Sequence, residues 1–110
     1  MRFFILTPAH EIQETSHEEW MDWFENSSEG IVEVAEDRVG DFLISTIFVG
    51  LEKDDAKELK LWETIVFNES APELDPPRER CSGTWEDAER MHHEVFCKTR
   101  DQETEQQDQK

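Results

Sequence analysis

The chain has 110 residues and a formal net charge of −17, because 28 acidic side chains stand against 11 basic ones. Residues 1–97 carry most of this excess, with 24 acidic and 8 basic side chains. A surface so negative repels nucleic acid and anionic membrane and attracts basic protein surfaces, and no apolar run approaches the ~20 residues of a membrane-spanning helix. Four Trp and seven Phe supply the apolar area for one packed domain.

The first half of the sequence predicts a strand, a helix and two further strands. Residues 2–7 are apolar and aromatic, as in a strand, and a polar connection leads from them to Ser16. We expect Ser16 to cap a helix over about 17–26, with apolar side chains on one side and acidic ones opposite. The acidic, β-branched segment 31–39 is typical of an edge strand, and the continuously apolar segment 41–50 is typical of a central one.

The second half predicts one more strand, a loop and a second helix. Residues 61–67 have the composition of a strand, whereas the segment 68–80 contains three prolines and predicts an irregular loop. Thr84 begins the second helix, with Asp87 three residues later as a variant of the capping box. Residues 98–110 are rich in Gln and Glu, and we expect them to form a disordered polar tail.

This order of elements, β-α-β-β-β-α, predicts an α+β fold. Short links between successive strands favour antiparallel pairing. We therefore expect a small antiparallel sheet of three or four strands, covered on its apolar face by the two helices. In this interpretation residues 1–97 form a single acidic domain and the polar tail follows it.

A row of carboxylates recurs at helical spacing in the first third of the chain. The intervals are 3, 4, 4, 3 and 4 residues for Glu11, Glu14, Glu18, Asp22, Glu25 and Glu29. Of these, Glu18, Asp22 and Glu25 fall within the predicted helix, where such charges lie about 5.4 Å apart and destabilise the helix. One functional interpretation of such a row is that it imitates the charges of a nucleic-acid backbone. The ordinary alternative is that these carboxylates form a solvated helix face. Together with the acids of segment 31–39, the candidate partner-binding residues are Glu14, Glu18, Asp22, Glu25, Glu29, Glu33, Glu36 and Asp37.

Two histidines and a cysteine near the C-terminus raise the question of a metal site. His93 and Cys97 are four residues apart on the predicted helix, with Glu89 one turn before His93. A structural zinc site needs four N or S ligands, commonly in paired short motifs, and only Cys81 could be added. His92 falls on the apolar face of the helix, where we expect a core histidine with one satisfied nitrogen. We therefore predict no metal, no cofactor and no catalytic residue.

The two cysteines, Cys81 and Cys97, do not make a disulfide framework. We interpret them as reduced thiols of a cytoplasmic protein, and the sequence leaves their pairing open. Arg78 and Arg80 lie close to Cys81 in the sequence and offer one route to a lowered thiol pKa. The simpler interpretation is that these arginines are incidental.

Several segments are similar to a family of small uncharacterised phage and prophage proteins. The segments are 45–51 (STIFVGL), 61–67 (LWETIVF), 79–81 (ERC) and 84–88 (TWEDA), followed by His92. The family pattern is S-T-V-x-L-G-L-D, then F-E-T-M-V-F, then E-R-Y-x-T-x-E-E-A and a histidine. The resemblance covers residues 45–92 and implies a phage context without an assigned activity.

Negative charge and a phage context together favour a non-enzymatic interaction protein. Our leading hypothesis is an inhibitor that mimics nucleic acid in the host cytoplasm. It would occupy a basic surface of a host protein or nucleoprotein complex, such as a CRISPR effector. The alternative is an accessory protein of phage DNA metabolism or virion assembly, in which the charge serves solubility only and a homodimer is allowed. A metal-dependent enzyme built on His92, His93 and Cys97 is the third hypothesis.

Overall fold

The structure is a computed structural model that describes residues 1–26 and 32–108. Its helices and strands confirm the α+β class. In chain order they are β1 (Arg2–Leu6), β2 (Ile12–Thr15), α1 (His17–Asn26), β3 (Val32–Val39), β4 (Phe42–Phe48), β5 (Leu51–Glu52), β6 (Trp62–Asn68), β7 (Arg78–Cys81) and α2 (Trp85–Asp108).

The strands form two antiparallel sheets, where we expected one. β1 lies between β2 and β5 in a three-stranded sheet, and the order of the four-stranded sheet is β3-β4-β6-β7. The long strands and α1 match the predicted segments closely, whereas β2, β5 and β7 are additions. β2 and β7 consist mostly of polar residues and lack the apolar pattern of a strand, and two prolines also precede β7. Each forms because a longer neighbour offers it an edge to pair with.

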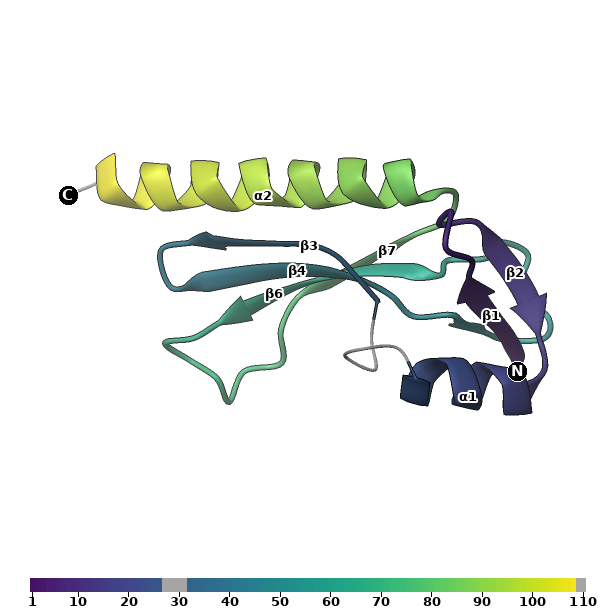
Figure 1. Cartoon of the computed structure of the whole chain (residues 1–110). Helices are drawn as coiled ribbons and strands as arrows, with labels where there is room; N and C mark the ends of the chain where they lie inside the picture. The colour runs from purple at the N-terminus through teal and green to yellow at the C-terminus, as the bar shows by residue number, and fades with distance from the viewer. Residues whose placement is uncertain (27–31, 109–110) are drawn as a thin grey trace.

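The centre of the four-stranded sheet is the pair β4 and β6. Their register places Ile44 opposite Val66 and Thr46 opposite Thr64. Because side chains alternate along a strand, these four residues point to the same face, which lies under α2 (Figure 1). Ile44, Thr46 and Thr64 are almost completely buried there.

Helix α2 runs along this face and provides the other half of the core (Figure 1). Ala88, Met91 and Val95 are buried on the side of the helix that faces the sheet. The predicted cap is confirmed: the Thr84 hydroxyl accepts the Asp87 N–H, and the Thr84 N–H donates to the Asp87 carboxylate over 2.8 Å.

Helix α2 extends beyond the segment expected for it. We expected residues 98–110 to be disordered, but the helix continues to Asp108. Thr99 contributes to this extension, because its side chain is buried and its hydroxyl donates to the Val95 carbonyl over 2.8 Å. Residues 109–110 of the expected tail lie outside the described residues.

Helix α1 packs mainly on the three-stranded sheet, whereas we expected both helices on one sheet. It contacts β1, where the rings of Trp20 and Phe3 lie 5.8 Å apart. The apolar side that the sequence predicts is only partly buried, and Met21 remains 40% exposed. Trp23 links the helix to the main core, since its ring meets that of Phe48 edge-on at 5.9 Å.

Gly50 lies where the chain passes from the larger sheet to the smaller one. It has a positive φ of 73°, and an added Cβ would lie 2.5 Å from the backbone oxygen of Phe4. The Phe4 N–H in turn donates to the Gly50 carbonyl over 2.9 Å. Glycine adopts this backbone conformation without strain and leaves room for so close an approach.

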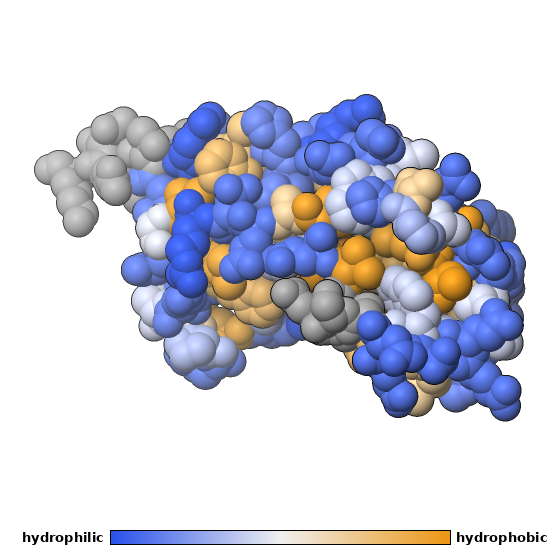
Figure 2. Space-filling model, in the orientation of Figure 1, coloured by the Kyte–Doolittle hydropathy of each residue, from blue (hydrophilic) through white to orange (hydrophobic). Residues whose placement is uncertain are grey.

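The molecule is elongated, with principal dimensions of 54 × 26 × 25 Å. Hydrophilic residues dominate the face drawn in Figure 2, and apolar residues show between them. Over residues 1–26 and 32–108, no helix combines the length and the apolar character that crossing a membrane requires.

Candidate functional site

Three members of the predicted row of carboxylates lie on a helix, and they are the three inside the predicted bounds 17–26. Only Glu18, Asp22 and Glu25 lie on α1, where all three are exposed. The helix carries no Lys or Arg, and no ion pair within the described residues reaches these three carboxylates. Asp22 accepts a hydrogen bond from the Asn26 amide over 3.0 Å, which orients the carboxylate without neutralising it. The outer face of α1 therefore presents three uncompensated negative charges.

Glu14 lies on β2 and is already paired. The Arg2 guanidinium donates to its two oxygens over 3.1 and 2.8 Å. These hydrogen bonds hold the pKa of the Glu14 carboxyl below its usual range. A carboxylate matched in this way attracts an external cation less than the three carboxylates of α1 do.

The acids of β3 point to both faces of the larger sheet. Glu33 and Glu36 are exposed on the face away from α2. Asp37 points toward α2 and binds a side chain of that helix. Glu29 lies outside the described residues. The eight candidate residues are thus divided among several surfaces, and the α1 face is the one on which three of them lie together.

A buried polar network joins α2 to the centre of the sheet. His92 is 5% exposed. Its Nε2 lies 2.8 Å from the Asp37 carboxylate, and its Nδ1 lies 2.7 Å from the Thr46 hydroxyl. The Thr46 hydroxyl lies 2.6 Å from that of Thr64. The sequence predicted one satisfied nitrogen for His92, whereas the structure engages both.

With a neutral His92 imidazole, the chemistry of these groups gives the network one direction. An ionised carboxylate only accepts hydrogen bonds, so Asp37 receives the proton on Nε2 of His92. In a neutral imidazole Nδ1 is then an acceptor, and the Thr46 hydroxyl donates to it. The Thr46 oxygen accepts in turn from Thr64. The Thr64 oxygen, at the inner end of the network, keeps its lone pairs and can accept a further hydrogen bond.

Neither a catalytic triad nor a metal site follows from this network. Carboxylate, imidazole and hydroxyl occur in the order of a nucleophilic triad, but the Thr46 side chain is completely buried and out of reach of a substrate. His92 has no nitrogen left for a metal. The Sγ of Cys97 lies 3.5 Å from Nε2 of His93, yet no three His, Cys, Asp or Glu side chains of the described residues gather as ligands.

Cys81 is not activated by the neighbouring arginines. Burial, followed by the charges of two carboxylates, raises the pKa of its thiol. Arg78 and Arg80 lie 3.7 and 4.0 Å from Glu63, whose side chain points to the sheet face away from α2. This agrees with the interpretation of the two arginines as incidental, and the alternative of a lowered thiol pKa is wrong. Cys81 and Cys97 are both free.

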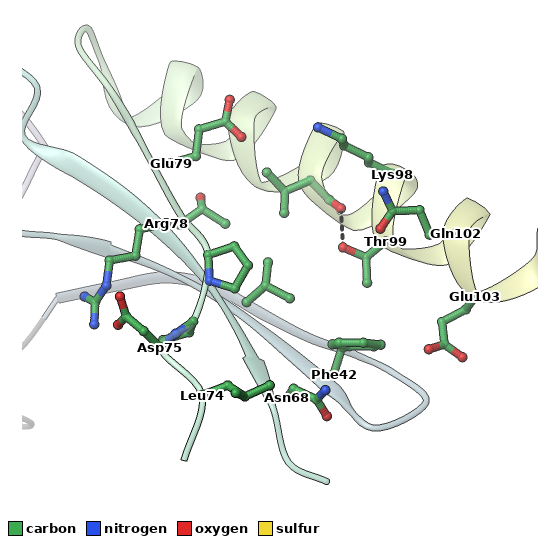
Figure 3. Close-up of a pocket in the computed structure, with 15 residues that line it drawn as sticks. Phe42, Asn68, Leu74, Asp75, Arg78, Glu79, Lys98, Thr99, Gln102 and Glu103 are labelled. Atoms are coloured by element: carbon green, nitrogen blue, oxygen red, sulfur yellow. Dashed lines mark hydrogen bonds between the residues drawn. The ribbon is translucent and has the colours of Figure 1, made fainter. Parts of the chain in front are cut away.

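A groove of about 510 Å³ opens between the C-terminal half of α2 and the larger sheet. Figure 3 shows Thr99, Gln102 and Glu103 of α2 on one side of it and Phe42 of β4 on the other. Thr64, at the inner end of the polar network, lies in its wall. The volume is within the range of pockets that hold small ligands. No sequence pattern points to this groove, because its two sides come from segments far apart in the chain.

No family model matches the chain, and no curated protein and no solved structure is significantly similar to it. The resemblance of residues 45–92 to phage proteins stays a prediction.

Proposed function

We propose that the chain is a non-enzymatic interaction protein that docks on a basic surface of a partner. The observation that carries this proposal is the outer face of α1, with its three exposed and uncompensated carboxylates Glu18, Asp22 and Glu25. Like charges one turn apart destabilise a helix by about 0.2–0.5 kcal/mol per pair. A basic surface that neutralises them removes this repulsion, so part of the binding free energy comes from relief of strain within α1.

The charge of the whole chain supports the same class of partner. A net charge of −17 produces a field that steers a basic surface toward the protein before contact. Salt screens this attraction over about 8–10 Å at physiological ionic strength. Binding through the α1 face is therefore strongly salt-dependent.

The sharper form of the proposal is mimicry of nucleic acid. A DNA strand carries one charge every ~3.4 Å of helix axis, and α1 presents one carboxylate on each turn, at a rise of about 5.4 Å. The partner is then a host nucleic-acid-processing complex, such as a CRISPR effector in the host cytoplasm, whose basic channel the protein occupies. The resemblance of residues 45–92 to phage proteins supports this context.

Charge reversal with a matched control tests the docking face. One variant replaces the three acids of α1 by lysine: E18K, D22K and E25K. The control makes the same change of charge at three exposed acids elsewhere: E73K, E89K and E94K. Circular dichroism first shows that both variants retain the fold.

Binding is then measured against a purified CRISPR effector complex, at roughly 50 and roughly 200 mM NaCl. We expect the wild type and the control to bind at low salt and to weaken about tenfold or more at the higher salt, because each contact displaces counterions. The α1 variant should lose binding at both. Equal binding by the α1 variant and the control would overturn the docking face. Binding that salt leaves unchanged would favour the accessory protein, in which charge serves solubility only.

A further inference from the structure

The groove under α2 has apolar walls and a polar interior. Its apolar lining comes from both sides and from the segment between β6 and β7: Phe42, Val66, Leu74, Pro76, Pro77 and Val95. Such walls hold an apolar body by excluding water from it. Two buried hydroxyls, those of Thr64 and Thr99, also lie in the lining.

In both side chains the hydroxyl proton is engaged elsewhere, which leaves the oxygen lone pairs as acceptors. Thr99 donates its proton to the Val95 carbonyl over 2.8 Å (dashed line in Figure 3). With His92 neutral, Thr64 donates to Thr46, because the network that begins at Asp37 then runs in that direction. Within the groove the two buried hydroxyls therefore act as hydrogen-bond acceptors. A ligand that fits them has to bring donors.

The charged side chains of the lining favour a cation. Three carboxylates stand at the rim, those of Asp75, Glu79 and Glu103. The carboxylate of Glu103 lies against the turn at Gly40, where an added Cβ would be 3.3 Å from its oxygen. Two cations also contribute to the rim, but Arg78 lies 3.7 Å from Glu63 and Lys98 is exposed on α2.

We propose that this groove binds a small organic amine, with its ammonium toward Thr64 and Thr99 and its apolar body against Phe42 and Val66. An ammonium has three donors and no acceptor, so it matches hydroxyls that only accept and a rim that is mainly acidic. A carboxylate or phosphate ligand would bring only acceptors to these two oxygens, so it would find no hydrogen-bond donor there. The site is distinct from the α1 face and goes beyond the proposed docking function, because the two lie on different sheets.

The probe is 4-phenylbutylamine, followed by amide chemical shifts of the full-length protein during titration. Three matched compounds separate the contributions: methylamine carries the charge without the apolar body, 4-phenylbutanol replaces the ammonium by a neutral hydroxyl, and 4-phenylbutanoate reverses the charge. We expect saturable shifts at the groove with 4-phenylbutylamine, affinity about tenfold lower for the alcohol, and no saturable shift with the other two. Equal affinity for the butanoate, or shifts spread over the surface without saturation, would overturn the proposal.

Variants locate the ammonium. Thr64→Val and Thr99→Val each remove one acceptor while retaining the shape of the side chain, and each should weaken 4-phenylbutylamine about tenfold. Thr64→Ser retains the hydroxyl and should bind within about twofold of the wild type. Glu103→Gln removes a rim charge and should weaken binding, whereas Glu94→Gln makes the same change at an exposed position of α2 outside the groove and should not.

Outcomes that contradict the proposal are equally specific. If Thr64→Val does not fold, Thr99→Val and Glu103→Gln still decide the question. Unchanged affinity in both of them would show that the amine does not lie in this groove. Tighter binding of a lysine-containing peptide than of 4-phenylbutylamine would replace the small-molecule site by a docking site for a partner segment.

Discussion

Asp37 and His92 are 55 positions apart in the sequence, and the carboxylate of the first lies 2.8 Å from Nε2 of the second. The Asp37 side chain is 52% exposed and that of His92 is 6% exposed, so this pair connects solvent with the core. Through Thr46 and Thr64 the same chain of hydrogen bonds reaches both central strands. A single buried network thus ties α2 to β3, β4 and β6.

The hydroxyl of Thr46 holds this network together. We expect Thr46→Val to lower the free energy of unfolding by about 1–3 kcal/mol, because it leaves Nδ1 of His92 and the Thr64 hydroxyl without their partner in a buried site. Thr46→Ser retains the hydroxyl and should cost clearly less. Urea unfolding followed by circular dichroism measures both. Equal losses in the two variants would show that the hydrogen bonds contribute little.

A comparison of Gly50 with Gly40 distinguishes the two costs of adding a Cβ, the strain of a positive φ and steric overlap with a neighbouring atom. Both have a positive φ, of 73° and 58°, so Ala at either position carries a conformational cost of about 1–2 kcal/mol. At Gly40 the nearest atom is a Glu103 carboxylate oxygen on a flexible side chain, whereas at Gly50 it is the backbone oxygen of Phe4 at 2.5 Å. We therefore expect Gly50→Ala to lower the free energy of unfolding by about 1–3 kcal/mol more than Gly40→Ala does. Thermal unfolding of the two variants measures the difference, and similar midpoints would contradict the steric argument.

The cap of α2 predicts a pH dependence. The Thr84 backbone N–H and hydroxyl hold the pKa of the Asp87 carboxyl below its ordinary value. A carboxyl whose pKa is lowered by folding stabilises the protein above its unfolded pKa, about 3.9 for Asp. This stabilisation is lost as the pH falls through the lower pKa of the folded state. Asp87→Asn lacks the charge at every pH.

The comparison of wild type and Asp87→Asn isolates this one group from the other 27 acidic side chains. We expect the wild type to unfold at higher urea concentration at neutral pH, and the two midpoints to converge as the solution is acidified below about pH 4. A constant separation between them down to the acid limit would assign the difference to something other than the charge of Asp87.

The raised pKa of Cys81 predicts a slow thiol. Since the thiolate is the reactive form, a Cys97→Ser variant should react slowly with a disulfide reagent at neutral pH. The rate should rise about tenfold for each pH unit and should show no plateau up to the ordinary thiol pKa of about 8.5. The rate constant is measured by absorbance against pH. A plateau near neutral pH would mean that an arginine activates the thiol after all.

Local signals explain which elements could be predicted. Ser16 and the helical spacing of apolar side chains predict α1, and Thr84 with Asp87 predicts the start of α2. β2 and β7 carry no such signal, because most of their residues are polar. Each is a strand only through its pairing with β1 or β6. The extension of α2 lacks a clear local signal, because the Gln-rich composition of 98–110 conceals the buried position of Thr99.

The polar network and the groove depend on contacts that composition and periodicity do not encode. Asp37 was grouped with the docking acids, and only the register of β3 on β4 turns it toward α2. One signal was present in the sequence: Thr46 and Thr64 interrupt two apolar strands, and His92 interrupts the apolar face of a helix. Polar side chains at core positions require hydrogen-bond partners, so these three residues could have been expected to bind one another.

The length of the molecule also bears on how its oligomeric state has to be measured. Its radius of gyration is 15.7 Å, whereas a compact chain of this size has a value of about 13 Å. A monomer with this shape migrates in gel filtration like a heavier sphere, and electrostatic repulsion from the column matrix speeds it further. An early elution volume would therefore imitate a dimer. Light scattering or sedimentation equilibrium, which measure mass without assuming a shape, is the valid test of self-association.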